Sequence, residues 1–207
     1  MLIFAGLGNP GSKYELNRHN LGFRAVDAIA ERHGFQSERA RFLGLARQGA
    51  IETPDGPVNV LVLKPQTFMN ESGQSVAQAM HFFKLKPKDV VAFHDELDLA
   101  PGRFRMKTGG GAAGHNGLRS VADWITPDFR RARLGVGHPG DKDRVLGYVL
   151  SNFSRDELGW VEALCAACAN AANLLAAGQD ERYQAEVLRL APAEKSDPRQ
   201  AGRDGAA

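Results

Sequence analysis

Apolar residues in the first third of the chain form short runs separated by polar turns. Residues 1–7 are almost entirely apolar and predict a buried first strand. Residues 21–33 carry apolar side chains at helical spacing, which predicts a helix. Residues 43–51 and 58–63 predict two strands joined by the turn Thr53-Pro-Asp-Gly56. The pattern is therefore strand, helix and a pair of strands.

The rest of the chain continues to alternate between strands and helices. Ser154-Arg-Asp-Glu157 is a capping box, and it marks the start of an alanine-rich helix that we expect to run to about residue 177. The other predicted elements are helices at 71–83, 118–124 and 180–190, strands at 90–93 and 131–136, and a glycine-rich loop at 108–114. This alternation predicts an α/β fold with one domain at residues 1–190, followed by a disordered polar tail at residues 191–207.

Composition limits the class of protein. A chain of 207 residues with 43% hydrophobic and 24% charged residues is typical of a soluble globular protein with one core. It has no long uncharged apolar stretch, and its first residues do not resemble a signal peptide. Two cysteines do not suggest a disulfide framework. We therefore expect a cytoplasmic protein with no membrane partner.

Positive charge gathers in residues 103–133, although the net charge is only +2. In Arg103-Phe-Arg-Met-Lys107 the cations alternate with apolar residues, so a strand here would place the charges on one face and Phe104 and Met106 on the other. The residues alone allow either a solvated sheet face or a surface that contacts phosphates. The cations of the segment are Arg103, Arg105, Lys107, Arg119, Arg130, Arg131 and Arg133.

The turn after the first strand, Gly6-Leu-Gly-Asn-Pro-Gly11, has the glycine spacing of a dinucleotide-binding loop. That function requires a helix that begins within the turn, but residues 11–18 lack an apolar stripe. It also requires an acidic residue after a second strand, whereas Glu31 lies in the predicted helix. We therefore interpret the turn as one that presents Asn9 and leads toward His19, and we expect no NAD.

Polar residues cluster where the chain leaves ordered elements. The stretches Arg18-His-Asn20, Thr67-Phe-Met-Asn70, His94-Asp-Glu-Leu-Asp98 and Gly114-His-Asn-Gly117 contain His, Asp and Asn. Ligands of α/β sheets bind outside the carboxyl ends of strands, so these side chains are expected to meet in one cleft. A His beside a carboxylate can act as a general base, and Asn amides can hold an oxyanion. Taken singly, each residue could equally be a loop cap.

Other chemistry is less well supported. His19, His94, Asp95 and His115 could bind a metal, but the usual H-x-x-x-H and H-x-H spacings are missing. Cys165-Ala-Ala-Cys168 has redox-motif spacing but lies within a predicted amphipathic helix, which favours packing. A serine hydrolase would need a G-x-S-x-G elbow, which the sequence lacks.

Several motifs occur in a fixed order along the chain. They are Gly6-Leu-Gly-Asn-Pro-Gly11, Tyr14 with Arg18-His-Asn20, Lys64-Pro-Gln-Thr-Phe-Met-Asn70, His94-Asp-Glu-Leu-Asp98, Gly109-Gly-Gly with Gly114-His-Asn-Gly-Leu118, and Gly135-Val-Gly-His-Pro-Gly140. Together they resemble bacterial peptidyl-tRNA hydrolases over residues 1–190. The resemblance implies a monomeric enzyme without metal or cofactor, built on a twisted mixed sheet surrounded by helices. It implies cleavage of the ester between a peptide and the 3′-terminal ribose of tRNA, which recycles tRNA from stalled or prematurely released peptidyl-tRNA.

The resemblance also implies roles for individual residues. His19 corresponds to the general base that activates water, and Asp95 to the carboxylate that orients it. Asn9 corresponds to the residue that separates peptidyl-tRNA from ordinary aminoacyl-tRNA. Asn70 and Asn116 correspond to residues that contact the peptide, the reacting carbonyl or the tRNA end. Tyr14 and Phe68 correspond to residues at the tRNA 3′ end. The residues that correspond to contacts with phosphates of the acceptor stem are Arg105, Lys107 and Arg133.

Two further points stay open at the level of sequence. A non-hydrolytic RNA-binding relative of the same fold is the main alternative, but a protein that only binds would not need the pair of His19 and Asp95. A generic esterase is a more distant alternative.

We also predict that the loop at residues 109–111, together with His115, acts as a mobile lid over the site.

Overall fold

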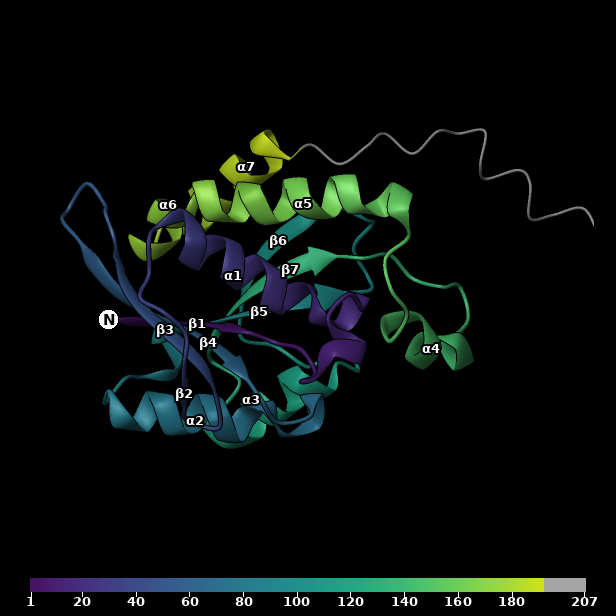
Figure 1. Ribbon diagram of the computed structural model, residues 1–207, viewed down its shortest axis with the longest axis horizontal. Coiled ribbons are helices and arrows are strands. Elements are labelled where there is room, and N and C mark those ends of the chain that lie inside the picture. The colour runs from purple at the N-terminus through teal and green to yellow at the C-terminus, as the bar shows by residue number, and fades with distance from the viewer. Residues whose placement is uncertain (192–207) are drawn as a thin grey trace, which may run out of the picture.

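The computed structural model describes residues 1–191 and shows one seven-stranded mixed sheet with the strand order β2-β3-β4-β1-β5-β7-β6 (Figure 1). The four central strands are parallel, and antiparallel strands complete both edges. The carboxyl ends of the parallel strands therefore meet along one edge of the sheet. The strands are β1 (Leu2–Gly6), β2 (Arg39–Arg41), β3 (Gly44–Ile51), β4 (Val58–Pro65), β5 (Val90–Glu96), β6 (Phe104–Thr108) and β7 (Arg130–Gly135).

Helices cover both faces of the sheet and bury a separate core on each (Figure 1). Along β1, Phe4 packs into one core while Ile3 and Ala5 pack into the other, which explains why this run has no polar positions. One face carries α1 (Leu21–Arg32), α5 (Arg155–Asn170), α6 (Ala172–Ala176) and α7 (Asp180–Leu190), the other carries α2 (Ser72–Phe82) and α3 (Asn116–Ile125), and α4 (Val145–Val149) stands apart from both layers. Short 3-10 helices occupy Ser12–Tyr14, Arg18–Asn20, Met69–Glu71, Pro87–Asp89 and Lys142–Arg144.

Two glycines bring the start of α1 against the strands. A Cβ on Gly22 would lie 2.2 Å from the carbonyl oxygen of Phe93, and a Cβ on Gly6 would lie 2.6 Å from the carbonyl oxygen of Gly22. Neither position can therefore hold a larger residue without moving the backbone. Because Arg18–Asn20 directly precedes α1, this close approach places His19 over the carboxyl end of β5.

The structure confirms the predicted α/β fold and corrects some elements. The strand predicted at 90–93 continues to Glu96, because the polar residues that follow Phe93 are buried. The helix predicted from Ser154 to 177 is interrupted at Ala171, where α5 gives way to α6. β2 and α4 were not predicted from the sequence. Most of the predicted tail, residues 192–207, lies outside the described residues.

Two sequence inferences about packing are confirmed. Ser154 and Glu157 form the predicted capping box at the start of α5. Cys165 and Cys168 are free thiols buried in the core, and burial raises the pKa of Cys165 to about 12. Such thiols are unreactive near neutral pH, so these cysteines are packing residues.

Within residues 1–191 there is no helix of the length and hydrophobicity that a membrane span requires.

Candidate active site

A cleft of about 390 Å³ opens beyond the carboxyl end of β5. The polar part of its lining includes His19, Asp95, His115 and Asn116, which come from different elements of the fold. The cleft therefore unites three of the four polar stretches that the sequence predicted to converge. Its apolar part includes Val145, Leu146 and Val149 from α4.

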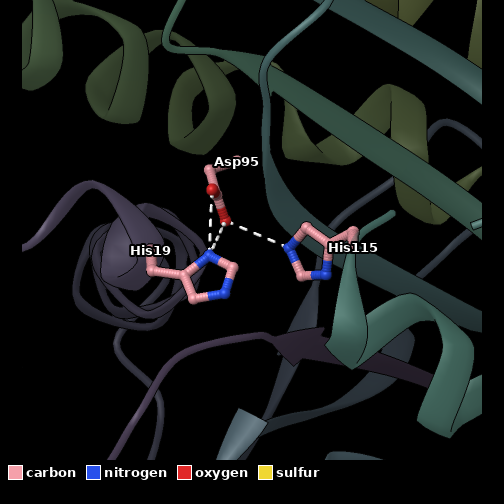
Figure 2. A group of neighbouring side chains, drawn as sticks. All are labelled: His19, Asp95 and His115. Carbon is pink, nitrogen blue, oxygen red and sulfur yellow. Dashed lines mark hydrogen bonds and ion pairs between the residues drawn. The ribbon is translucent and has the colours of Figure 1, made fainter. Parts of the chain in front are cut away.

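His19 and Asp95 form a buried pair (Figure 2). The Nδ1 atom of His19 lies 2.9 Å from both carboxylate oxygens of Asp95. An ionised carboxylate only accepts hydrogen bonds, so Nδ1 carries the proton and donates it. In the neutral ring, Nε2 then has the free lone pair, and this is the tautomer that a general base requires.

His115 is a second donor to Asp95, with Nε2 3.1 Å from Oδ1 (Figure 2). Its other nitrogen, Nδ1, caps α3 by accepting the backbone N–H groups of Gly117 and Leu118. Because Nδ1 accepts, Nε2 must carry the proton of the neutral ring. Asp95 therefore receives hydrogen bonds from two histidines. The sequence predicted that the stretch containing His115 reaches the cleft, but the helix cap that orients its ring was not predicted.

The charges of this network determine its protonation. Burial by itself would raise the pKa of Asp95, but His19 and His115 outweigh burial and hold that pKa well below the ordinary value. Burial by itself would lower the pKa of His19, but the charge of Asp95 and its hydrogen bond raise it above the ordinary 6.5. Asp95 is thus a stable anion, and His19 binds a proton more readily than a free imidazole does.

His94 is a structural neighbour of the network. Burial lowers its pKa to about 3, and the nearby His115 adds to this effect. The ring packs edge-on against His115, and its Nδ1 lies 2.8 Å from the carbonyl oxygen of Asp95. His94 thus stays neutral and supports the position of the residues around it.

His19, Asp95 and His115 also place three possible metal-ligating atoms within 4.8 Å of one another. A histidine that binds a metal normally donates its second N–H to an acceptor. His115 does the opposite, because its Nδ1 accepts two backbone N–H groups and its Nε2 therefore holds the proton. This donor set fits a hydrogen-bond network better than it fits a metal ion.

Asn9 lies outside this cleft, in the lining of a separate pocket that also includes Asn20. It is 8% exposed, and its backbone N–H and C=O are both bonded to the side-chain amide of Asn20. Its side-chain oxygen accepts the N–H of Met69 at 2.8 Å. The oxygen is therefore occupied, which leaves the Nδ2 group of Asn9 as the free donor. Asn20 follows His19 and Met69 precedes Asn70, so Asn9 joins two of the predicted polar stretches.

Comparison with known proteins identifies the family. The family model described as "Peptidyl-tRNA hydrolase" matches residues 3–195. The peptidyl-tRNA hydrolase of Phenylobacterium zucineum is 68% identical over 199 residues, which cover 96% of this chain and 95% of that protein. The peptidyl-tRNA hydrolase of Caulobacter vibrioides is 60% identical, over 99% of this chain and 100% of that protein. The chain belongs to the peptidyl-tRNA hydrolase family. The resemblance seen in the sequence motifs is confirmed.

Solved structures agree with this assignment. The crystal structure of the peptidyl-tRNA hydrolase from Acinetobacter baumannii superposes with a TM-score of 0.83 at 39% identity, covering 90% of this chain and 94% of that one. A crystal structure of a peptidyl-tRNA hydrolase in complex with N-propanol gives a TM-score of 0.85, covering 93% and 97% of the two chains. The predicted α/β architecture is therefore that of the peptidyl-tRNA hydrolase fold.

Like Asn9, the residues Tyr14, Phe68 and Asn70 implied by the family resemblance lie outside the cleft lining. Phe68 is 57% exposed, and Asn70 is also exposed, one residue on each side of Met69. Tyr14 is half-buried, with the ammonium group of Lys13 4.6 Å from its ring centre. Their proposed contacts with tRNA or peptide stay predictions.

The basic segment divides into exposed and buried cations. On β6, Arg105 and Lys107 are exposed while Phe104 is buried, as the alternation predicted. Arg105 pairs across the strands with Arg133 of β7. The Nε of Arg133 donates to Glu96 at 2.8 Å, and Glu96 lines the cleft. Arg133 is therefore connected to the candidate active site through Glu96, and Arg105 is its cross-strand neighbour.

Arg130 and Arg131 do not belong to this exposed surface, which corrects the sequence view of one continuous basic segment. Arg131 is 2% exposed and donates to the carbonyl oxygens of Gly110 and Gly111, each at 2.6 Å. Arg130 pairs with Asp180 at the start of α7. Arg131 thus anchors the glycine-rich loop, while the predicted lid motion of that loop stays a prediction.

Proposed function

We propose that this chain hydrolyses the ester between a peptide, or an N-blocked amino acid, and the 3′-terminal ribose of tRNA. His19 is the general base, and Asp95 orients it. The observation that supports this most strongly is the contact of His19 Nδ1 with both Asp95 oxygens at 2.9 Å, which leaves Nε2 free. Membership of the peptidyl-tRNA hydrolase family supplies the substrate class.

The proposed reaction needs only water as co-reactant. His19 Nε2 takes a proton from water while the water oxygen bonds to the ester carbonyl carbon. The tetrahedral intermediate collapses as the bond to the ribose oxygen breaks, and His19 returns the proton to that oxygen. Asp95 stabilises the imidazolium formed between these steps. Asn116, which lines the cleft, and Asn70 supply amide N–H groups for the carbonyl oxygen or the peptide.

The free donor of Asn9 accounts for selection of blocked substrates. The acyl group on a blocked amino end presents a carbonyl oxygen, which the Nδ2 group of Asn9 can bind. A free α-amino group is a charged hydrogen-bond donor. The Nδ2 group of Asn9 would then face another donor in a buried site, and neither would have an acceptor. Leaving a buried polar group unpaired costs about 1–3 kcal/mol, and more when charge is involved. Asn9 therefore favours peptidyl-tRNA over aminoacyl-tRNA.

We also propose contacts with the tRNA and a monomeric working state for the protein. Tyr14 and Phe68 contact the tRNA 3′ end, and Arg105, Lys107 and Arg133 contact phosphates of the acceptor stem. The domain of residues 1–190 works as a monomer in the cytoplasm, without metal or cofactor. Exposure of Phe68, Arg105 and Lys107 supports these contacts.

The test compares an N-acetylated aminoacyl-tRNA with the same tRNA carrying a free amino group, both in the presence of chelator. We expect the wild type to release only the blocked amino acid and His19→Ala to release neither. Tight binding of tRNA by the wild type without any release would instead indicate a non-hydrolytic RNA-binding relative.

A further inference from the structure

Arg18, the residue before His19, makes a dense set of contacts with the segment between α4 and α5. The side chain is buried, and its Nη2 lies 2.7 Å from both carboxylate oxygens of Glu157. Its Nη1 donates to the hydroxyl of Ser151 at 2.8 Å and to the carbonyl oxygen of Asn152 at 2.7 Å. One guanidinium therefore holds Ser151 and Asn152, which follow α4, together with Glu157 in the first turn of α5.

Aromatic rings fix the same guanidinium. Its central carbon lies 4.4 Å from the ring centre of Tyr148 and 5.1 Å from that of Phe153. Tyr148 belongs to α4, and Phe153 lies just before α5. The planar group is thus held by stacking as well as by hydrogen bonds.

The backbone repeats the connection. The N–H of Arg18 donates to the carbonyl oxygen of Ser151 at 3.1 Å, and Asn17 forms an antiparallel bridge with Asn152. The N–H of Phe153 donates to the carbonyl oxygen of Leu16 at 3.2 Å. The segment that carries His19 and the segment that follows α4 are therefore joined along several residues.

Stability alone explains this arrangement poorly. Burying an ion pair removes two charges from water, and an apolar replacement of similar volume is often as stable. The contacts of Arg18 instead fix the position of His19 relative to α4. His19 lies at one end of these contacts, and α4, whose side chains line the cleft, lies at the other. We propose that Arg18 is a positioning residue, which sets His19 relative to the α4 side of the cleft. This inference rests on the proposed role of His19 as general base.

A positioning role predicts a specific kinetic defect. The base must lie within hydrogen-bond reach of the attacking water, and a misplacement of about 1 Å can cost about 10²-fold in rate. Lysine at position 18 would keep the charge but would offer a single point of contact instead of a planar fork. Arg18→Lys therefore removes the geometry of the clamp while it leaves the net charge unchanged.

The experiment measures kcat, KM and Tm of Arg18→Lys with N-acetylated aminoacyl-tRNA. The matched control is Arg130→Lys, because Arg130 is also 8% exposed and pairs with a carboxylate, that of Asp180, but is bound to α7 and the Leu175 carbonyl. We expect Arg18→Lys to lower kcat by about 10–100-fold while KM changes by less than about threefold. Arg130→Lys should lower Tm and leave kcat within about twofold.

Glu157→Gln is a second variant, which leaves Arg18 in place and weakens its ion pair. It tests the positioning role if Arg18→Lys fails to fold. Its kcat should fall by about tenfold. The proposal would be overturned if the folded Arg18→Lys and Glu157→Gln variants kept a kcat within about threefold of the wild type. A rise in KM without a fall in kcat would also overturn it. So would a loss of kcat in Arg130→Lys equal to that in Arg18→Lys. His19→Ala separates the two ideas. If His19→Ala is inactive, a failed Arg18 test leaves the base assignment intact; if it is fully active, the base assignment itself is wrong.

Discussion

The network around Asp95 and the exposed face of β6 are two charged regions separated only by β7, and they are built in opposite ways. Asp95 is 2% exposed and accepts hydrogen bonds from two histidines that come from different elements. Arg105 and Lys107 are exposed, and neither forms an ion pair with another described residue. The first region fixes atoms in place, and the second leaves long side chains free.

This difference follows from what each region is proposed to do. Proton transfer requires a defined tautomer and a short distance, and a buried network supplies both. Binding of tRNA phosphates requires positive charge and reach but little exact geometry, so exposed side chains suffice. Substitutions in the buried network should therefore reduce kcat strongly, while substitutions on β6 should change binding moderately.

The largest expected effect is that of Asp95→Asn, which we expect to lower kcat by about 10²–10⁴-fold. The side-chain amide of the variant would present an N–H donor to the Nδ1 of His19. The neutral ring would then carry its proton on Nε2 instead of Nδ1. A general base needs a lone pair on Nε2, so this tautomer is inactive. Steady-state release of N-acetylated amino acid from tRNA measures this loss. Asp123→Asn, on the exposed surface of α3, is the control that should keep wild-type kcat. A loss of less than about tenfold in Asp95→Asn would contradict the assigned role of the carboxylate.

Asn9→Asp should change selectivity more than rate. The carboxylate could still accept the N–H of Met69, but it would present an acceptor where Asn9 presents a donor. We expect the ratio of kcat/KM for blocked over free aminoacyl-tRNA to fall by about 10²-fold. Asn59→Asp, on exposed β4 surface, serves as the control. An active Asn9→Asp enzyme with unchanged selectivity would remove Asn9 from substrate discrimination.

Charge reversal on β6 should have the smallest effect. We expect Arg105→Glu combined with Lys107→Glu to raise KM by about 3–10-fold at low salt and to change kcat by less than about twofold. The rise in KM should shrink as salt increases, because the wild type loses its phosphate contacts as well. Reversal of Lys86 and Lys88, which lie at the opposite end of β5, is the matched control. Equal effects in both double variants would show that only net charge matters.

The sequence predicted those features that depend on local pattern. Alternation along β6 placed Arg105 and Phe104 on opposite faces, and the capping box marked the start of α5. The convergence of the polar stretches was predicted from Asp95 following a strand, and the pairing of His19 with Asp95 from the family resemblance.

Features that depend on distant partners could not be predicted. Arg130 is buried because Asp180, fifty residues away, pairs with it, and the local sequence does not reveal that partner. His115 joins the network because its ring caps α3 in one orientation. Asp95 was expected in a loop, but buried partners allow the polar end of β5 to stay within the sheet.

The central claim is that His19 acts as a base whose proton affinity is set by Asp95, and the pH dependence of kcat/KM tests it most directly. Only the neutral ring can accept a proton from water, so activity must rise with pH as His19 loses its proton. Since Asp95 raises the pKa of His19, the midpoint of that rise should lie above 6.5 and should match the titration of the His19 ring measured by NMR. A midpoint below 6.5, or one that differs from the NMR titration of His19, would contradict the account.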